Sequence, residues 1–134
     1  MLDKIGILIV GGAVGTLSRY YLAEWGQSVW GSHFPYGTLL VNMTGCLLMG
    51  CVVGFAESRY SGLIEMPYQL RLLLMTGFLG AFTTFSSYEL EALLLLRAGA
   101  WERALLYLAG SVVLGLLVMW AGLRGTRFLL AGVN

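Results

Sequence analysis

The stretch MTGFLGAFTTFSSY, residues 75–88, is apolar enough for a membrane, yet it carries two glycines and hydroxyl side chains at positions 83, 84, 86 and 87. An uninterrupted helix needs neither feature. A helix that is interrupted inside a bilayer needs both, because its freed backbone groups must be satisfied by hydroxyls, ions or neighbours. The pattern predicts a span broken at its centre, and such spans often hold an ion or substrate site. A glycine-rich packing face is the alternative.

The composition of the whole chain also indicates a membrane protein. Hydrophobic residues make up 58% of the 134 residues and charged residues only 11%, whereas soluble domains average about 25% charged residues. This composition excludes an ordinary soluble enzyme, a disordered chain and a secreted disulfide scaffold. The net charge is only +1 and there is no basic patch, so nucleic acid is not an expected partner.

Several apolar runs are long enough to cross a bilayer, which takes about 20 residues. We expect one domain covering residues 1–134, with spans at approximately 4–23, 35–56, 69–97 and 102–123. Glycines interrupt the first run and no small-residue cleavage site follows it, so we expect a retained helix rather than a signal peptide. The predicted fold class is an all-α membrane protein with four transmembrane helices per subunit, the third of them broken mid-membrane.

The basic residues give a weak orientation signal. One side of the membrane would carry Lys4, Arg59, Arg71, Arg124 and Arg127. The other side would carry Arg19, Arg97 and Arg103. An excess of Lys and Arg on one side normally sets orientation. So small an excess leads to the hypothesis that the chain inserts both ways and forms an antiparallel, dual-topology homodimer.

Two of the predicted spans carry side chains that could line an ion pathway. Asn42 offers amide donors in an apolar helix, where it could serve an anion or equally well hold two helices together. Phe85, Tyr88 and Glu91 are spaced to share one helix face, and aromatic ring edges are electropositive. An aromatic stripe packed on a neighbouring helix is the simpler interpretation of that spacing. Glu91 fits either a buried acid or an interfacial residue.

The first and last spans add three further polar candidates. Tyr107 and Ser111 lie one turn apart and could supply hydroxyls to the same pathway, although a helical serine more often bonds its own backbone. Arg19 lies near the end of the first span, where a charge must pair or reach the interface. We expect Arg19 either to extend its charge to the membrane interface or to have a structural role, with Glu24 or backbone carbonyls as candidate partners, rather than to bind an ion.

No arrangement of residues suggests catalysis or a zinc site. The chain lacks paired carboxylates, a Ser-His-Asp set, HExxH and a Walker-type loop, so we expect a non-enzyme. Cys46 and Cys51 fit small buried side chains in an apolar run, and His33 has no second histidine or CxxC nearby.

Three motifs in order along the chain resemble the CrcB/Fluc family of fluoride ion channels. They are GAVGTLSRY at 12–20, GTLLVN at 37–42 with Gly45, and GFLGAFTTFSS at 77–87. The resemblance covers nearly the whole length. It implies four-helix subunits that form antiparallel homodimers with two fluoride pores, a third helix broken at its centre, and a structural sodium ion on the dimer axis.

The resemblance also implies roles for individual side chains of the pore. Asn42 matches the pore asparagine, and Phe85 matches the first aromatic residue whose ring edge faces fluoride. Tyr107 and Ser111 match the polar residues of the fourth helix, and the Ser86 hydroxyl adds a donor. Tyr88 stands where the family commonly has a second pore phenylalanine, so its ring edge is kept and a phenol is added.

The sodium ion implied by the resemblance would be held by backbone oxygens alone. Gly80 and Thr83 match the positions whose carbonyls supply them, and Arg19 matches the arginine of the first-helix motif. Ala81 replaces a common glycine just before the break.

The function implied is passive, fluoride-selective export across the cell (inner or plasma) membrane, in which the bilayer, fluoride, sodium and a second copy are the partners. One alternative is a small multidrug exporter, which needs a carboxylate deep in the membrane that the first span lacks. The other is a non-transporting assembly subunit, whose glycines serve packing alone.

Overall fold

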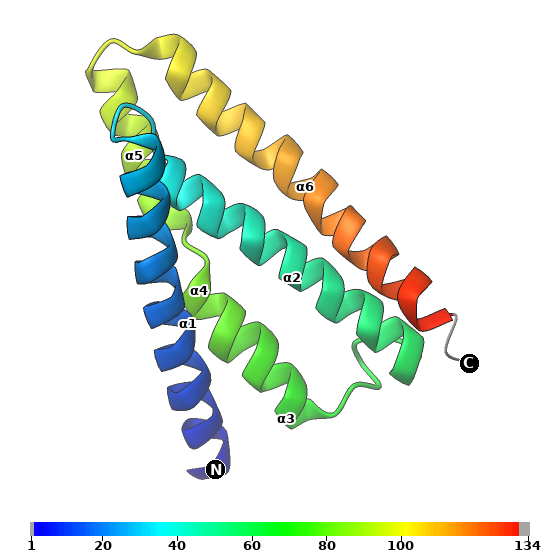
Figure 1. The fold of residues 1–134 in the computed structure, drawn as a ribbon. Coiled ribbons are helices and arrows are strands. Elements are labelled where there is room, and N and C mark those ends of the chain that lie inside the picture. Colours follow the sequence, from blue (N-terminus) through cyan, green and yellow to red (C-terminus); the bar gives the residue numbers. More distant parts are fainter. Residues whose placement is uncertain (1, 132–134) are drawn as a thin grey trace.

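The computed structural model describes residues 2–131, and all regular secondary structure in that range is helical. The elements are α1 (Leu2–Trp30), α2 (Tyr36–Tyr60), α3 (Tyr68–Arg71), η1 (Leu72–Leu79), α4 (Gly80–Phe82), α5 (Phe85–Arg97) and α6 (Trp101–Ala131) (Figure 1). Because α3 to α5 follow one another as a single segment, Tyr68–Arg97, residues 2–131 contain four segments long and apolar enough to cross a membrane. The predicted all-helical fold with four candidate spans is confirmed.

The helices run further than the predicted spans. α1 continues beyond position 23, α2 beyond 56 and α6 beyond 123. The predicted ends were placed where charged residues begin, but a charged side chain does not stop a helix, because its stem can pack while its head reaches water. Backbone geometry ends α1 and α2 instead, since Gly31 and Ser61 follow them with φ of 81° and 63°.

The third segment changes its backbone geometry twice. η1 is a π-helix, a wider form in which the Gly80 amide bonds the Met75 carbonyl five residues back. After α4 the backbone becomes extended, with ψ of 160° at Thr83 and 119° at Thr84 (Figure 1). The helix resumes at Phe85, where the Thr84 side chain caps the new N-terminus.

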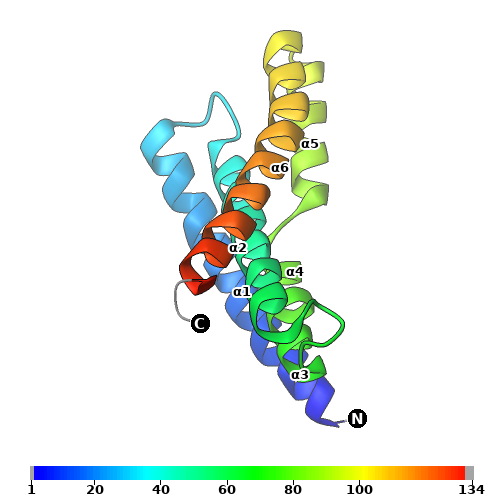
Figure 2. The same cartoon turned by 90° about the vertical axis from the view of Figure 1, so that its right-hand side faces the viewer.

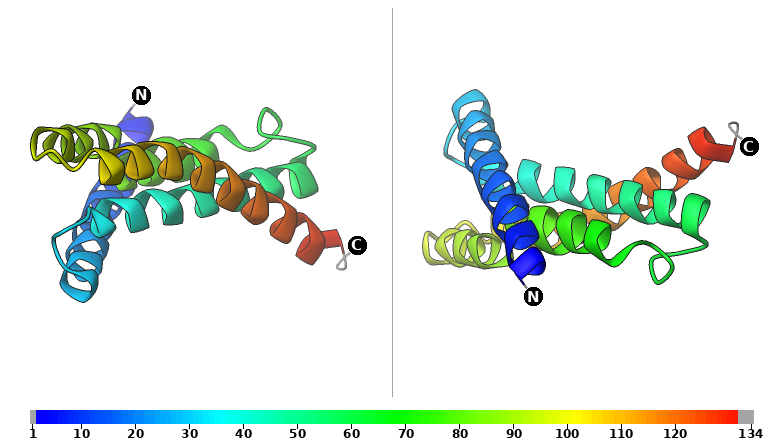
Figure 3. Two further views of the ribbon diagram at one scale, coloured as in Figure 1. Left: turned by 90° about the horizontal axis from the view of Figure 1, so that it is seen from above. Right: turned by 90° about the horizontal axis from the view of Figure 1, so that it is seen from below.

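The helices form an open arrangement in which α2 runs along α6, and α5 lies next to the first part of α6 (Figure 2). α1 packs on η1 and α4 and runs across their direction (Figure 3). Glycines allow the closest crossing: a Cβ at Gly50 of α2 would meet the Met119 carbonyl oxygen, and one at Gly122 of α6 would meet that of Leu47. Small residues at helix crossings are typical of membrane proteins.

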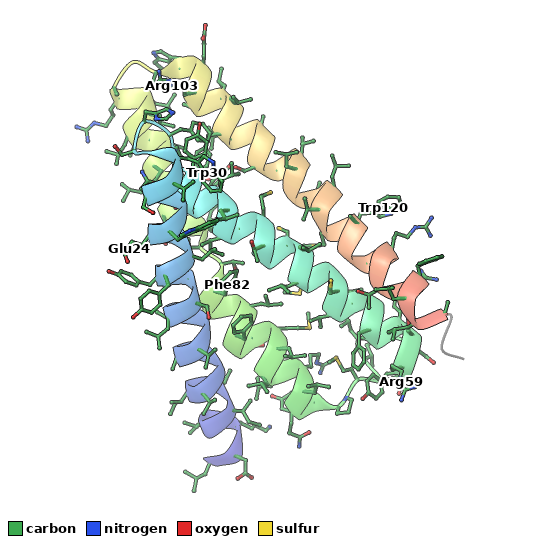
Figure 4. The ribbon with its side chains drawn as sticks, in the orientation of Figure 1. Glu24, Trp30, Arg59, Phe82, Arg103 and Trp120 are labelled. Atoms are coloured by element: carbon green, nitrogen blue, oxygen red, sulfur yellow. The ribbon has the colours of Figure 1, made fainter. Side chains whose placement is uncertain are left out.

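Most large apolar side chains lie outside the small buried core. One core cluster contains Val41, Leu79 and Phe82, and a second contains Tyr88, Ala92 and Tyr107. Exposed apolar residues cover the outer faces of α1 and α6, as expected of surfaces that meet lipid or another chain. Trp30 and Arg103 lie near one end of the molecule and Arg59 near the other (Figure 4).

Candidate functional site

Asn42 holds the extended segment of the third span. Its Nδ2 donates to the Thr84 carbonyl oxygen at 3.0 Å, and its Oδ1 accepts from the Thr84 amide at 2.9 Å. The Thr84 amide, which the unwinding frees, is thereby satisfied, and the Thr84 carbonyl at the N-cap of α5 gains a side-chain donor. The Asn42 amide carries a second N–H donor. Asn42 also lines a cavity of about 250 Å³ with Thr83 and Phe85, so it both joins two segments and faces an open space.

The same interactions leave the Gly80 and Thr83 carbonyls without their usual helical donors. In an α-helix each carbonyl accepts from the amide four residues ahead. For Gly80 that amide belongs to Thr84, which donates to Asn42 instead. For Thr83 it belongs to Ser87, which donates to the Thr84 hydroxyl at 3.3 Å.

These two carbonyl oxygens therefore suit a hard monovalent cation that binds main-chain oxygen. Residues 2–131 contain no group of three or more His, Cys, Asp or Glu side chains that could hold a metal. The donor set thus fits sodium better than a transition metal.

Glu91 of α5 joins three helices through its carboxylate. Thr38 of α2 donates its hydroxyl to Oε1 at 2.7 Å, and Tyr107 of α6 donates its phenol to Oε2 at 2.8 Å. Both donors are buried. Of the two expected settings for Glu91, the structure shows a hydrogen-bonded acid between helices. Sequence reasoning did not single out Thr38, although it lies one turn before Asn42 on the same face of α2.

Phe85 and Tyr88 have different environments despite their spacing. Their ring centroids are 5.8 Å apart, but Phe85 is 73% exposed and Tyr88 only 7%. The Tyr88 phenol donates to the Leu108 carbonyl oxygen of α6 at 2.8 Å. Its ring lies 5.0 Å from that of Tyr107. The added hydroxyl of Tyr88 is therefore directed into a helix contact.

Ser111 does not bond its own backbone, contrary to the simpler expectation for a helical serine. Its Oγ is buried and has no hydrogen-bond partner within residues 2–131. Ser111 and Tyr107 line a second cavity, of about 290 Å³, with apolar neighbours that include Leu39 and Leu114.

Arg19 and Ser86 line the largest of the described cavities, of about 550 Å³. Of the settings expected for Arg19, pairing does not occur among the described residues, where Arg19 forms no ion pair or side-chain hydrogen bond. Glu24 lines the same cavity but forms no ion pair with Arg19 within residues 2–131. Thr84 borders both this cavity and the one beside Asn42.

The four apolar segments within residues 2–131 define a multi-pass membrane protein. Polar residues gather around the unwound part of the third segment, as expected where irregular backbone lies within a membrane. The chain belongs to the family described as "CrcB-like protein, Camphor Resistance (CrcB)", which matches residues 7–123.

Curated relatives resemble the chain over almost its whole length. A protein of Nitratidesulfovibrio vulgaris (strain Miyazaki F), named fluoride-specific ion channel FluC, is 44% identical over 126 residues, which cover 94% of this chain and 98% of the relative. A protein of the same name from Maridesulfovibrio salexigens is 40% identical over 130 residues, covering 97% and 100%. A third, from Stutzerimonas stutzeri, is 45% identical over 117 residues, covering 87% and 91%.

Proposed function

We propose that the protein is a fluoride-selective ion channel. The observation that carries the proposal is the cavity at the extended segment, where the Asn42 amide and the Phe85 ring lie next to Thr83 and Thr84. Relatives that share about two-fifths of its residues are named fluoride-specific channels. A channel needs no catalytic residues, which agrees with the expectation of a non-enzyme.

The chemistry of these groups suits a small, strongly hydrated anion. Fluoride must exchange its water for hydrogen-bond donors, and it must not be bound so tightly that it stays. The Asn42 amide, the Ser86 and Ser111 hydroxyls and the Phe85 ring edge offer donors or positive edges without a full charge. Arg19 lines a separate, wider cavity, where its charge would raise the local concentration of anions.

The direction of transport follows from the ion and the membrane potential. Hydrogen fluoride enters cells as the neutral acid and dissociates at cytoplasmic pH. In the plasma (inner) membrane, an interior-negative potential then drives the anion outward through a passive pore.

A second copy of the chain would complete the pore. Phe85 lines a cavity with Asn42 and is still 73% exposed, so its ring is accessible to a second copy. The weak orientation bias of the basic residues favours insertion both ways, which would give an antiparallel homodimer with two pores. A structural sodium ion would be held by the Gly80 and Thr83 carbonyls, whose helical donors are diverted to Asn42 and Thr84.

The direct test is ion efflux from liposomes that carry the purified protein, with fluoride and chloride measured in parallel. Electrogenic fluoride efflux without chloride leak is the expected result. Absence of fluoride flux from folded, dimeric protein would contradict the proposal. Flux of lipophilic cations would support an exporter instead.

Phe85→Ile is expected to lower fluoride efflux by about tenfold. Isoleucine keeps an apolar side chain of similar volume and loses the ring edge, whose interaction with an anion resembles that of other aromatic contacts of roughly 1 kcal/mol or more. Phe128→Ile is the matched control, because Phe128 is an exposed phenylalanine at the end of α6, away from the cavities described. Equal flux for both variants would argue against a role for the Phe85 ring.

A further inference from the structure

The two cysteines of α2 border different cavities. Cys46 and Cys51 are both partly buried and both have free thiols. Cys46 lines the cavity of about 250 Å³ that Asn42 and Phe85 also line. Cys51 lines another cavity, of about 320 Å³, among mostly apolar neighbours. Of the two cysteines, Cys46 is therefore the one that shares a cavity with the candidate pore residues.

Two methionines border the same cavity as Cys46. Met49 follows Cys46 by three residues on α2, so the two side chains lie on one helix face. Met119 reaches the cavity from α6. The two helices meet at this level, because a Cβ at Gly115 of α6 would lie 3.3 Å from the Cys46 Sγ, and Met119 lies one turn beyond Gly115. One thiol and two thioethers from two helices thus gather around one open space.

Sulfur ligands select soft metal ions. Thiolate and thioether groups favour Cu(I), whereas carbonyl oxygens favour hard cations. Ag(I) has the same charge and the same preference for sulfur. When such an ion binds, it takes the place of the Cys46 thiol proton, which passes to water, and no electron is transferred. This sulfur cluster differs in chemistry from the carbonyl oxygens of Gly80 and Thr83, which suit sodium.

A metal ion in this cavity would act directly on conduction. It would share the space with the Asn42 amide and the Phe85 ring. A pore conducts only if the permeating ion binds weakly enough to leave again. A fixed positive charge in the cavity attracts an anion strongly and holds it there.

We propose that Cys46, Met49 and Met119 form a binding site for a soft monovalent metal cation, Cu(I) or Ag(I), and that a cation bound there blocks fluoride conduction. The binding site concerns only the sulfur groups of this chain. The block rests on the proposed function of the chain as a fluoride channel.

The first experiment measures fluoride efflux from liposomes at increasing concentrations of Ag(I). The silver is added as nitrate in chloride-free solutions, because silver chloride precipitates. Each variant is compared with its own efflux rate without silver. Cys51→Ser is the matched control for Cys46→Ser, because it removes the same group from α2 at a different cavity. Wild type and Cys51→Ser should be blocked at the same silver concentration, and Cys46→Ser only at a much higher one.

The second experiment tests the two thioethers. Met49→Leu and Met119→Leu each remove a sulfur and nearly preserve the side-chain volume. Even outer-shell partners of a metal contribute roughly 10–100-fold to its affinity, so the loss of a direct ligand should raise the half-blocking silver concentration by at least about tenfold. Met75→Leu on η1 is the control, because Met75 is not among the residues that line this cavity. These variants keep both cysteines, so they test the site even if Cys46→Ser fails to fold.

A third measurement does not depend on transport. Elemental mass spectrometry of the purified protein in chloride-free detergent gives the number of silver ions bound per chain. Cys46→Ser is expected to hold one silver ion fewer than the wild type.

Each outcome bears on one of the two proposals. A wild type without fluoride efflux would overturn the channel function, and the silver count would still test the site. A conducting wild type with equal block in Cys46→Ser and Cys51→Ser would overturn the metal site. Wild-type sensitivity in both Met49→Leu and Met119→Leu would also overturn it, because the thiol alone would then account for the block. Silver that binds without slowing efflux would overturn the block. Reduced silver sensitivity in the three site variants, with both controls unchanged, supports the proposal.

Discussion

Asn42→Asp is expected to abolish fluoride efflux and to lower the thermal unfolding midpoint. The aspartate can still accept from the Thr84 amide, but it can no longer donate to the Thr84 carbonyl oxygen. It places an acceptor against an acceptor at 3.0 Å, the distance now spanned by a hydrogen bond. Losing this hydrogen bond and placing two acceptors face to face destabilises the segment by about 1–3 kcal/mol, and a negative charge at the cavity repels an anion.

The measurement is efflux from liposomes together with thermal unfolding in detergent. Gln69→Glu is the matched control, because it changes an amide to a carboxylate at an exposed position of α3. We expect the control to behave as the wild type. Wild-type efflux from Asn42→Asp would show that neither the Thr84 contact nor the Asn42 donor is needed for conduction.

Gly50→Ala is expected to destabilise the packing of α2 on α6. The added methyl group would meet the Met119 carbonyl oxygen, with the Met119 carbonyl carbon at 2.9 Å and the Leu123 amide nitrogen at 3.0 Å. These are backbone atoms, so the helices must separate. Overpacking of this kind destabilises a protein by about 1–3 kcal/mol. Efflux should fall as well, because α2 carries Asn42 and α6 carries Ser111.

Gly125→Ala is the matched control for this crossing. Gly125 also lies on α6, but a Cβ there would have no atom within 4 Å. Alanine favours a helix over glycine by about 1 kcal/mol, so this variant should unfold at the same temperature as the wild type or higher. Equal midpoints for the two variants would contradict the close crossing at Gly50.

The number of candidate membrane spans can be predicted from the length of the apolar runs in the sequence. A membrane helix needs about 20 apolar residues, and each predicted span has them without reference to any other. Charges marked where the apolar runs stop, whereas the backbone at Gly31 and Ser61 ends α1 and α2.

The unusual composition of the stretch at 75–88 is also visible in the sequence alone. Glycines and hydroxyls in an apolar run require a reason, and the extended backbone at Thr83 and Thr84 provides one. The same pattern could not say which residue would satisfy the freed groups. Asn42 does so from a position 42 residues away in the chain.

The roles of the polar side chains depended on how the helices cross. Spacing placed Tyr88 and Phe85 on one face, but only the position of α6 directs the Tyr88 phenol to the Leu108 carbonyl. Proximity along the chain made Glu24 one candidate partner of Arg19, but within residues 2–131 no ion pair joins the two side chains. Hydropathy identifies a membrane helix, because transfer of a segment into lipid depends on the polarity of its own side chains. Hydrogen bonds between distant helices depend on crossing geometry, which close glycine contacts such as that of Gly50 with Met119 determine.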